Sequence, residues 1–290
     1  MIKTLCPTNF PDYELIDAGS FQKIERFGNQ VLIRPEPQAV WLPELSRKEW
    51  HSLADTIFEP DRDEYERGRW ILGKNSKESW QIRYPLADKN LVFNLQLTSF
   101  KHLGIFPEQA GNWDFIYDCC KKRSSAKVLN LFAYTGGASL AARAGGAEVW
   151  HLDSVKKVLN WTKQNMESSG MQDIRWVLED AFSFVQREKR REKKYDGIIL
   201  DPPAYGRGPD GERWIMESMI DELMEACADI LNPGGFLVLN LYSMGLSALI
   251  AENLVQKHFK ISPEIGELFV PDRIGIKLPL GIFARFDFLK

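Results

Sequence analysis

An acidic residue followed by two prolines is the feature of this sequence best suited to chemistry. Asp201-Pro202-Pro203 ends an apolar run, and Tyr205 follows two positions later. The prolines fix two φ angles, so the turn is stiff and holds a reacting atom in a set place. Asp201 is placed to accept a hydrogen bond from a nucleophile, and Tyr205 to offer a flat face to a base. The alternative is an ordinary turn at a strand end.

A glycine-containing loop, residues 133–138 (AYTGGA), also follows an apolar run. It lacks the G-x-G-x-x-G spacing that brings a dinucleotide pyrophosphate onto a helix N-terminus, and it lacks the G-x-x-x-x-G-K-S/T pattern of a phosphate-binding loop. Its glycines still let the backbone approach a ligand closely. The loop therefore predicts a ligand with an adenosine and an amino-acid tail but no phosphate, which disfavours NAD.

Two acidic residues stand where such a ligand would need them. Asp153 ends the next apolar run, 23 positions after Asn130, where an acid is placed to accept hydrogen bonds from both ribose hydroxyls. Asp180-Ala181 follows a third run and is placed at the adenine edge. A helix N-cap is the alternative role for each acid, and for Asp180 the two roles stay open.

These residues must be positioned by an alternation of apolar runs and amphipathic stretches that begins at Lys127. Such alternation predicts a parallel sheet with helices on both faces, which binds ligands at the carboxyl ends of its strands. The expected strands are 127–134, 148–153, 174–178, 195–201, 236–242, 267–270 and 282–288, and the expected helices are 137–144, 155–169, 181–192, 214–231 and 246–259.

The first hundred or so residues differ in composition from the rest. They are rich in proline, tryptophan and turn residues, with short apolar or alternating runs at 30–34, 80–84 and 91–97. We therefore expect a small β-rich domain over residues 1–90 and an α/β domain over residues 91–290.

Composition limits the remaining choices. No apolar run reaches the roughly 18 residues of a membrane span and residues 1–10 lack a secretory signal, so we expect a cytoplasmic protein. The four cysteines, including adjacent Cys119 and Cys120, suit free thiols, and no histidine pairs with a cysteine at metal-ligand spacing, so no metal is expected. The net charge of −3 weighs against a dedicated nucleic-acid binder, and the basic run 187–194 is interpreted as a solvated helix end.

Together these residues resemble the class I S-adenosylmethionine-dependent methyltransferases, and more narrowly the ribosomal RNA large-subunit methyltransferases and their relatives. The resemblance runs from about Leu91 to the C-terminus. Four ordered motifs carry it: GIFPEQAGNWDFI (104–116), VLNLFAYTGGASL (128–140), HLDSVKKVLNW (151–161) and YDGIILDPPAYGRG (195–208). It implies a Rossmann-like, mostly parallel seven-stranded sheet, S-adenosylmethionine as cofactor and RNA as substrate.

The resemblance also implies roles for individual residues. Asp153 would hold the ribose and Asp180-Ala181 would face the adenine, while Phe106 and Gln109 would close over the cofactor. The methyl-transfer site would be formed by Asp201, Pro202, Pro203 and Tyr205, and the methionine part of the cofactor would be lined by Asn130, Phe132, Tyr134, Thr135 and Gly136.

Departures from the family pattern limit the choice of acceptor. Amino-group methylases of nucleic acids carry an aromatic directly after the prolines, whereas here Ala204 stands there and Tyr205 is one position late. Cytosine C5 methylases place a cysteine nucleophile after the fifth strand, where this chain has Ser243. We therefore predict that the protein methylates RNA, with ribosomal RNA as the favoured substrate, and that it does not methylate cytosine at C5. A small-molecule or protein acceptor and a non-catalytic cofactor-binding module stay open, as does the oligomeric state.

Overall fold

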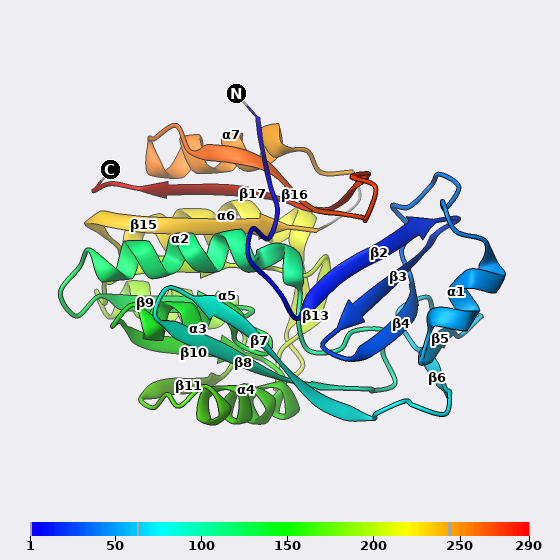
Figure 1. Cartoon of the computed structure of the whole chain (residues 1–290). Helices are drawn as coiled ribbons and strands as arrows, with labels where there is room; N and C mark the ends of the chain where they lie inside the picture. The colour runs from blue at the N-terminus through cyan, green and yellow to red at the C-terminus, as the bar shows by residue number, and fades with distance from the viewer. Residues whose placement is uncertain (1, 63, 243–244, 290) are drawn as a thin grey trace. The chain divides into compact units, whose positions relative to one another are not determined.

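The computed structural model describes residues 2–62, 64–242 and 245–289. The chain divides into two compact units, whose residue ranges can be followed in Figure 1 on its scale of residue number. The larger unit contains Met1–Leu5, Gly111–Leu268 and Gly281–Lys290, and the smaller unit contains Cys6–Ala110 and Phe269–Leu280. The domain boundary expected between residues 90 and 91 stays a prediction.

The larger unit is built on an eight-stranded sheet in the order β1-β16-β17-β15-β12-β9-β10-β11. The five strands from β15 to β11 run parallel to one another, while β17 is antiparallel to β15. The predicted α/β class is confirmed, and β1, parallel to β16, adds one strand to the seven expected. The strands are β1 (Lys3–Leu5), β9 (Lys127–Leu131), β10 (Glu148–Asp153), β11 (Ile174–Leu178), β12 (Tyr195–Leu200), β15 (Leu231–Leu241), β16 (Glu264–Pro271) and β17 (Lys277–Asp287).

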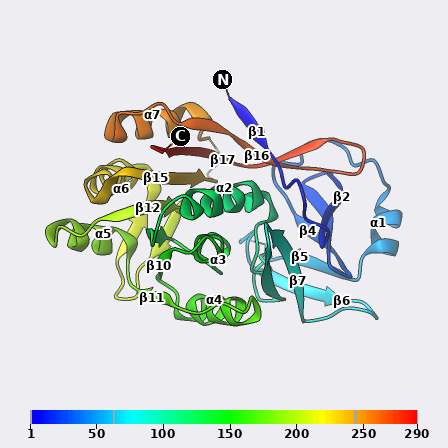
Figure 2. The same ribbon diagram turned by 60° about the vertical axis from the view of Figure 1, so that its left-hand side comes forward.

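Helices cover both faces of this sheet, as its near-continuous apolar strands require. Figure 2 shows α2, α3 and α4 on one side of the sheet and α5, α6 and α7 on the other. Leu129, Ile198 and Leu237, on three neighbouring strands, are fully buried between the layers. The helices are α2 (Ala110–Lys121), α3 (Gly137–Ala144), α4 (Lys156–Ser168), α5 (Ala181–Arg190), α6 (Met216–Ile230) and α7 (Ala248–Phe259).

A short antiparallel ribbon, β13 (Tyr205–Arg207) and β14 (Arg213–Ile215), separates β12 from α6. The helix expected from about Trp214 begins two residues later, at Met216, and Trp214 itself belongs to β14. The indole N–H of Trp214 donates to the carbonyl oxygen of Pro203 at 2.7 Å, and its ring lies 4.9 Å from that of Phe132. These tertiary contacts hold Trp214 in extended backbone, although its sequence context favours a helix.

The smaller unit is rich in β-structure, as expected. It contains a five-stranded sheet in the order β2-β3-β4-β5-β6, a two-stranded sheet of β7 and β8, helix α1 and the 3-10 turn η1. The elements are β2 (Tyr13–Gly19), β3 (Gln22–Phe27), β4 (Gln30–Pro35), α1 (Arg47–Leu53), β5 (Thr56–Pro60), β6 (Gly68–Leu72), β7 (Ser79–Leu86), β8 (Lys89–Gln96) and η1 (Pro107–Gln109).

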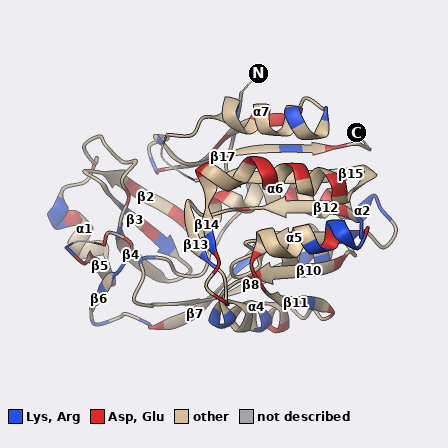
Figure 3. Ribbon diagram, turned by 180° about the vertical axis from the view of Figure 1, so that it is seen from behind, with Lys and Arg blue, Asp and Glu red and all other residues tan. Residues whose placement is uncertain are grey.

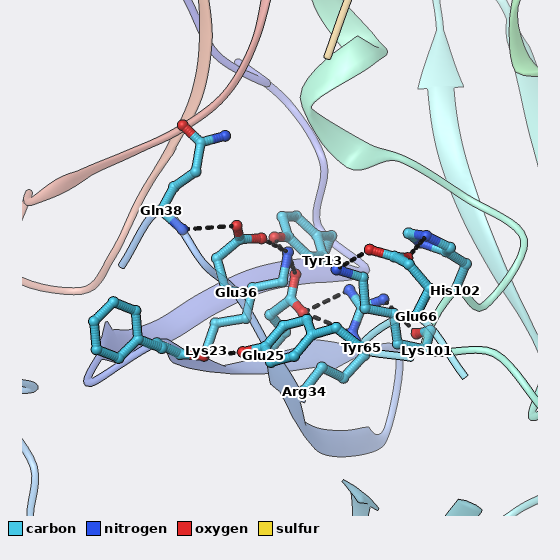
Figure 4. Close-up of polar contacts among 11 residues, drawn as sticks. Tyr13, Lys23, Glu25, Arg34, Glu36, Gln38, Tyr65, Glu66, Lys101 and His102 are labelled. Carbon is cyan, nitrogen blue, oxygen red and sulfur yellow. Dashed lines mark hydrogen bonds and ion pairs between the residues drawn. The ribbon is translucent and has the colours of Figure 1, made fainter. Parts of the chain in front are cut away.

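Glu25 lies at the centre of a charged cluster in the smaller unit (Figure 4). Arg34 donates two hydrogen bonds to one of its carboxylate oxygens, at 2.6 and 3.0 Å. The hydroxyl of Tyr13 donates to the other oxygen at 2.8 Å, and the ammonium of Lys23 lies 3.4 Å from it. Burial raises the pKa of Glu25, but the charges of Arg34 and Lys23 outweigh it, so the net shift is downward. The carboxylate is therefore ionised and fully paired.

Candidate active site

Three neighbouring strands end level with one another and so bring the predicted site residues of the larger unit to one edge. Leu131, the last residue of β9, lies opposite Leu152 of β10 and Leu200 of β12. The next residues along each chain segment are Phe132, Asp153 and Asp201. The three segments therefore emerge at the carboxyl edge of the sheet, where parallel sheets bind ligands.

The loop after β9 has an unusual backbone. Phe132 and Tyr134 have φ angles of 54° and 47°, and Gly136 has 91°. The left-handed region is unfavourable for residues with a side chain, and such strain gathers at functional sites. The amide of Ala133 donates to the carbonyl of Leu152 at 3.0 Å, so the neighbouring strand helps to hold the loop in this shape.

The two glycines of this loop are explained by packing. A Cβ atom on Gly136 would lie 2.2 Å from the methyl carbon of Thr162, and one on Gly137 would lie 2.7 Å from the ring of Trp113. Any side chain would push α4 or α2 away from the loop. The pair therefore lets both helices pack closely against the loop.

A chain of buried polar groups lies beneath the loop, and the sequence analysis missed it. Asn130 donates to the hydroxyl of Ser139 at 2.9 Å, and that hydroxyl lies 2.9 Å from Nδ1 of His151. Nε2 of His151 lies 3.3 Å from the hydroxyl of Thr162. Burial lowers the pKa of His151 to about 3, so the ring is neutral. Because the hydroxyl of Thr162 donates its one proton to the carbonyl of Tyr134, it can only accept from the ring, so we assign the ring proton to Nε2 and the hydroxyl proton of Ser139 to Nδ1.

This polar chain ends on the backbone of the loop. The hydroxyl of Thr162 donates to the carbonyl of Tyr134 at 2.8 Å, and the amide of Asn165 donates to the carbonyl of Thr135 at 2.9 Å. Both donors come from α4. One available signal was the presence of histidine and asparagine inside apolar strands, because buried polar groups need partners.

Asp153 is tied to the same loop. Its carboxylate accepts from the amide of Tyr134 at 2.9 Å and from that of Val155 at 2.9 Å. Burial raises the pKa of Asp153 to about 6, although these two amides oppose the shift. A carboxylate withdrawn from water in this way is stabilised by further hydrogen-bond donors. The two hydroxyls of a ribose are donors of that kind.

Asp180 has the N-cap role that the sequence left open. Its carboxylate accepts from the amide of Ser183 at 2.8 Å, and Ala181 is the first, buried residue of α5. A Cβ atom on Gly208, at the tip of the β13–β14 ribbon, would lie 3.0 Å from Cβ of Asp180. The ribbon therefore reaches Asp180, whose contact with adenine stays a prediction.

The turn at Asp201-Pro202-Pro203 is held by the ribbon that follows it. The carbonyl of Pro203 accepts from Trp214, as described above, and the carbonyl of Ala204 accepts from the amide of Met216 at 3.0 Å. Tyr205 begins β13 with 52% of its surface exposed. Hydrogen bonds to the carbonyls of Pro203 and Ala204 thus hold the end of the turn, while the ring of Tyr205 is exposed to solvent.

The remaining predicted residues lie elsewhere. Phe106 and Gln109 belong to the smaller unit, where the amide of Gln109 donates to the carbonyl of Phe106 at 3.1 Å, and their place over a cofactor stays a prediction. Ser243 falls outside the described residues. Burial raises the pKa of the Cys119 thiol to about 12.

Two further features are absent from the described part of the chain. No group of three His, Cys, Asp or Glu side chains there is arranged to hold a metal ion. None of the helices in that part is both long and apolar enough to cross a membrane.

Known proteins resemble this chain in sequence and fold. Residues 48–262 match the family model for S-adenosylmethionine-dependent methyltransferases. A solved S-adenosylmethionine-dependent methyltransferase from Agrobacterium tumefaciens is 36% identical, with a TM-score of 0.90 over 98% of this chain and 93% of that one.

Two curated relatives carry the name ribosomal RNA large subunit methyltransferase K/L. The protein from Shewanella sediminis is 30% identical over 89% of this chain and 38% of its own length. That from Shewanella frigidimarina is 29% identical over 74% of this chain and 31% of its own length. This chain therefore spans only about a third of the length of these relatives.

The residues at the carboxyl edge fit S-adenosylmethionine. Its ribose diol would supply hydrogen-bond donors to the half-buried carboxylate of Asp153, and it has no phosphate, in keeping with a loop that lacks a phosphate-binding pattern. The family match covers most of the chain, and the solved relative shares its fold from end to end. The chain belongs to the family of S-adenosylmethionine-dependent methyltransferases.

Proposed function

We propose that this protein methylates RNA, with ribosomal RNA as the substrate class, by chemistry other than cytosine C5 methylation. The observation that carries the proposal is that β9, β10 and β12 end at the same level of the sheet. Asp153 and the Asp201-Pro202-Pro203 turn therefore lie on the same carboxyl edge. The names of the curated relatives support RNA as the acceptor.

S-adenosylmethionine supplies an activated methyl group on a positively charged sulfur. Asp153 would hold the ribose, Asp180-Ala181 would face the adenine, and Phe106 and Gln109 would close over the cofactor. The methionine part would be lined by the loop after β9 together with its strand, that is by Asn130, Phe132, Tyr134, Thr135 and Gly136. The α4 side chains under this loop keep its backbone in the shape described above.

The acceptor would be aligned by the turn after β12. Methyl transfer needs alignment of donor and nucleophile above all, and a stiff turn provides it. Asp201 would accept a hydrogen bond from the nucleophile and take its proton if it carries one. Pro202 and Pro203 would fix the distance, and the exposed ring of Tyr205 would stack on the target base.

A protein or small-molecule acceptor is the second candidate, and the surface of α6 favours it. Figure 3 shows acidic residues along this helix. Five exposed acids lie on it: Glu217, Asp221, Glu222, Glu225 and Asp229. Asp221 and Asp229 are paired with Lys257 and Lys189, and the other three acids leave a negative surface that repels RNA phosphates.

The proposed location is the cytoplasm, because the four cysteines are free thiols, as in a reducing compartment.

Methyl-labelled S-adenosylmethionine separates these candidates. Purified protein is incubated with it and, in parallel, with total cellular RNA, a protein extract or a small-molecule extract. We expect label in large-subunit ribosomal RNA, and loss of that label in Asp201→Ala without loss of cofactor affinity. Label confined to the protein or small-molecule fraction would contradict the RNA proposal. Finding 5-methylcytidine as the product would contradict the predicted chemistry.

A further inference from the structure

The β13–β14 ribbon presents one exposed face beside the methyl-transfer turn. Alternation along β13 puts Tyr205 and Arg207 on the same face, and strand pairing sets Ile215 opposite Tyr205 and Arg213 opposite Arg207. All four side chains are exposed, whereas Trp214, on the other face, is buried. The ribbon therefore carries an aromatic ring, an aliphatic side chain and two guanidinium groups on its solvent side.

This exposed face is fixed relative to the proposed site. Trp214 is bonded to the carbonyl of Pro203 and packs against Phe132, the first residue of the cofactor loop. Tyr205 follows the Pro-Pro turn after one residue, Ala204, whose carbonyl is also bonded. A ligand group bound on this face is consequently held at a constant distance from the turn.

The two arginines form an unfavourable pair without an anion. Like charges directly opposite one another destabilise a strand pair. In the described part of the chain neither guanidinium forms an ion pair, and Nε of Arg207 donates instead to the hydroxyl of Tyr205 at 3.1 Å. Glu212 is next to Arg213 in the sequence, but its carboxylate accepts a hydrogen bond from the amide of Asp210 at 3.0 Å, within the turn that joins β13 to β14.

We propose that Arg207 and Arg213 together bind one phosphate of the RNA strand, next to the nucleotide that receives the methyl group. The inference rests on the proposed function and adds a residue-level contact to it. Two planar guanidinium forks suit the oxygens of a phosphate, and the neighbouring ring of Tyr205 suits an unstacked base. The acidic surface of α6 and the net charge of −3 make a local basic contact necessary, because the protein as a whole does not attract RNA.

The test uses the whole protein and protein-free large-subunit ribosomal RNA. Arg207→Gln with Arg213→Gln should raise the KM for RNA roughly ten-fold, about the effect of losing one charge-assisted hydrogen bond. The slope of log affinity against log salt should become shallower by about 0.7, the value for one phosphate of a single strand. Cofactor affinity should stay at the wild-type value, and the melting temperature should not fall, because the substitution removes the repulsion between the two charges.

The matched control is Arg190→Gln with Lys193→Gln, two exposed cations of the same unit at the end of α5 and just beyond it. It changes the net charge equally, so it removes the same long-range attraction, and it should leave KM near the wild-type value. Arg207→Lys with Arg213→Lys keeps both charges but loses the fork geometry, and should fall between wild type and the glutamine variant.

The outcomes separate this inference from the function on which it rests. If RNA is methylated and the glutamine variant matches the control in KM and salt slope, the arginine pair binds no phosphate and the inference is wrong while the function stands. If wild-type protein methylates no RNA, the proposed function fails and takes this inference with it.

Discussion

The hydroxyl of Thr162, on α4, donates a hydrogen bond of 2.8 Å to the carbonyl oxygen of Tyr134, a residue with a φ of 47° in the loop after β9. A helix side chain thus ties down a backbone conformation that the loop would not favour alone. Replacing Thr162 tests whether the loop must be held to bind the cofactor.

Thr162→Val keeps the shape of the side chain but removes its hydroxyl. We expect a loss of about 1 kcal/mol in the free energy of unfolding and weaker binding of S-adenosylmethionine, because the loop relaxes. Isothermal calorimetry and urea unfolding measure the two effects. Thr162→Ser retains the hydroxyl and should bind the cofactor more tightly than the valine variant. Equal weakening in both variants would show that packing, not the hydrogen bond, matters.

His151 should make the protein sensitive to acid. Burial lowers its pKa in the folded state to about 3, whereas an unfolded histidine has a pKa of about 6.5. Between about pH 6.5 and pH 3 the unfolded state therefore binds one more proton than the folded state. The free energy of unfolding falls as the pH falls through this range. Urea unfolding at pH 7 and pH 5 measures how much of the free energy of unfolding is lost between these pH values. This loss should be smaller in His151→Asn than in wild type. Identical losses would contradict a buried neutral ring.

Asp153 should give cofactor binding a pH dependence. Its pKa of about 6 means that the carboxyl is protonated below that pH and then accepts hydrogen bonds poorly. We expect affinity for S-adenosylmethionine to rise as the pH rises through about 6 and to level off above it. Asp153→Asn should bind at least about 1.5 kcal/mol more weakly at pH 8 and lose this dependence. A pH profile unchanged by the substitution would remove Asp153 from the ribose site.

Glu25 should be critical for the stability of the smaller unit. Glu25→Gln leaves the buried Arg34 and Lys23 without their shared carboxylate, which typically costs about 3–5 kcal/mol. Glu78→Gln makes the same charge change at an exposed position of that unit and should be nearly neutral. Thermal unfolding followed by circular dichroism compares them. Similar melting temperatures for both variants would show that the cluster contributes little.

The alternation of apolar runs from Lys127 was enough to predict the parallel sheet, because each strand buried on both faces must be apolar along its length. Motif spacing likewise placed Asp153 and Asp201 at strand ends. Both kinds of signal are local, since they depend on residues a few positions apart. Predictions from these signals agree with the structure wherever the local preference and the tertiary environment favour the same conformation.

Other features required contacts between residues distant in the chain. The sequence around Trp214 favours a helix, but contacts with Pro203 and Phe132 hold this residue in a strand. The series Asn130, Ser139, His151 and Thr162 joins two strands and two helices, and no spacing reveals that their polar atoms meet. Sequence alone determined the main strands and helices of the sheet from Lys127 onward and which of its strand ends carry acids. Tertiary structure decided which polar groups lie within hydrogen-bonding distance, because that depends on how separate elements pack.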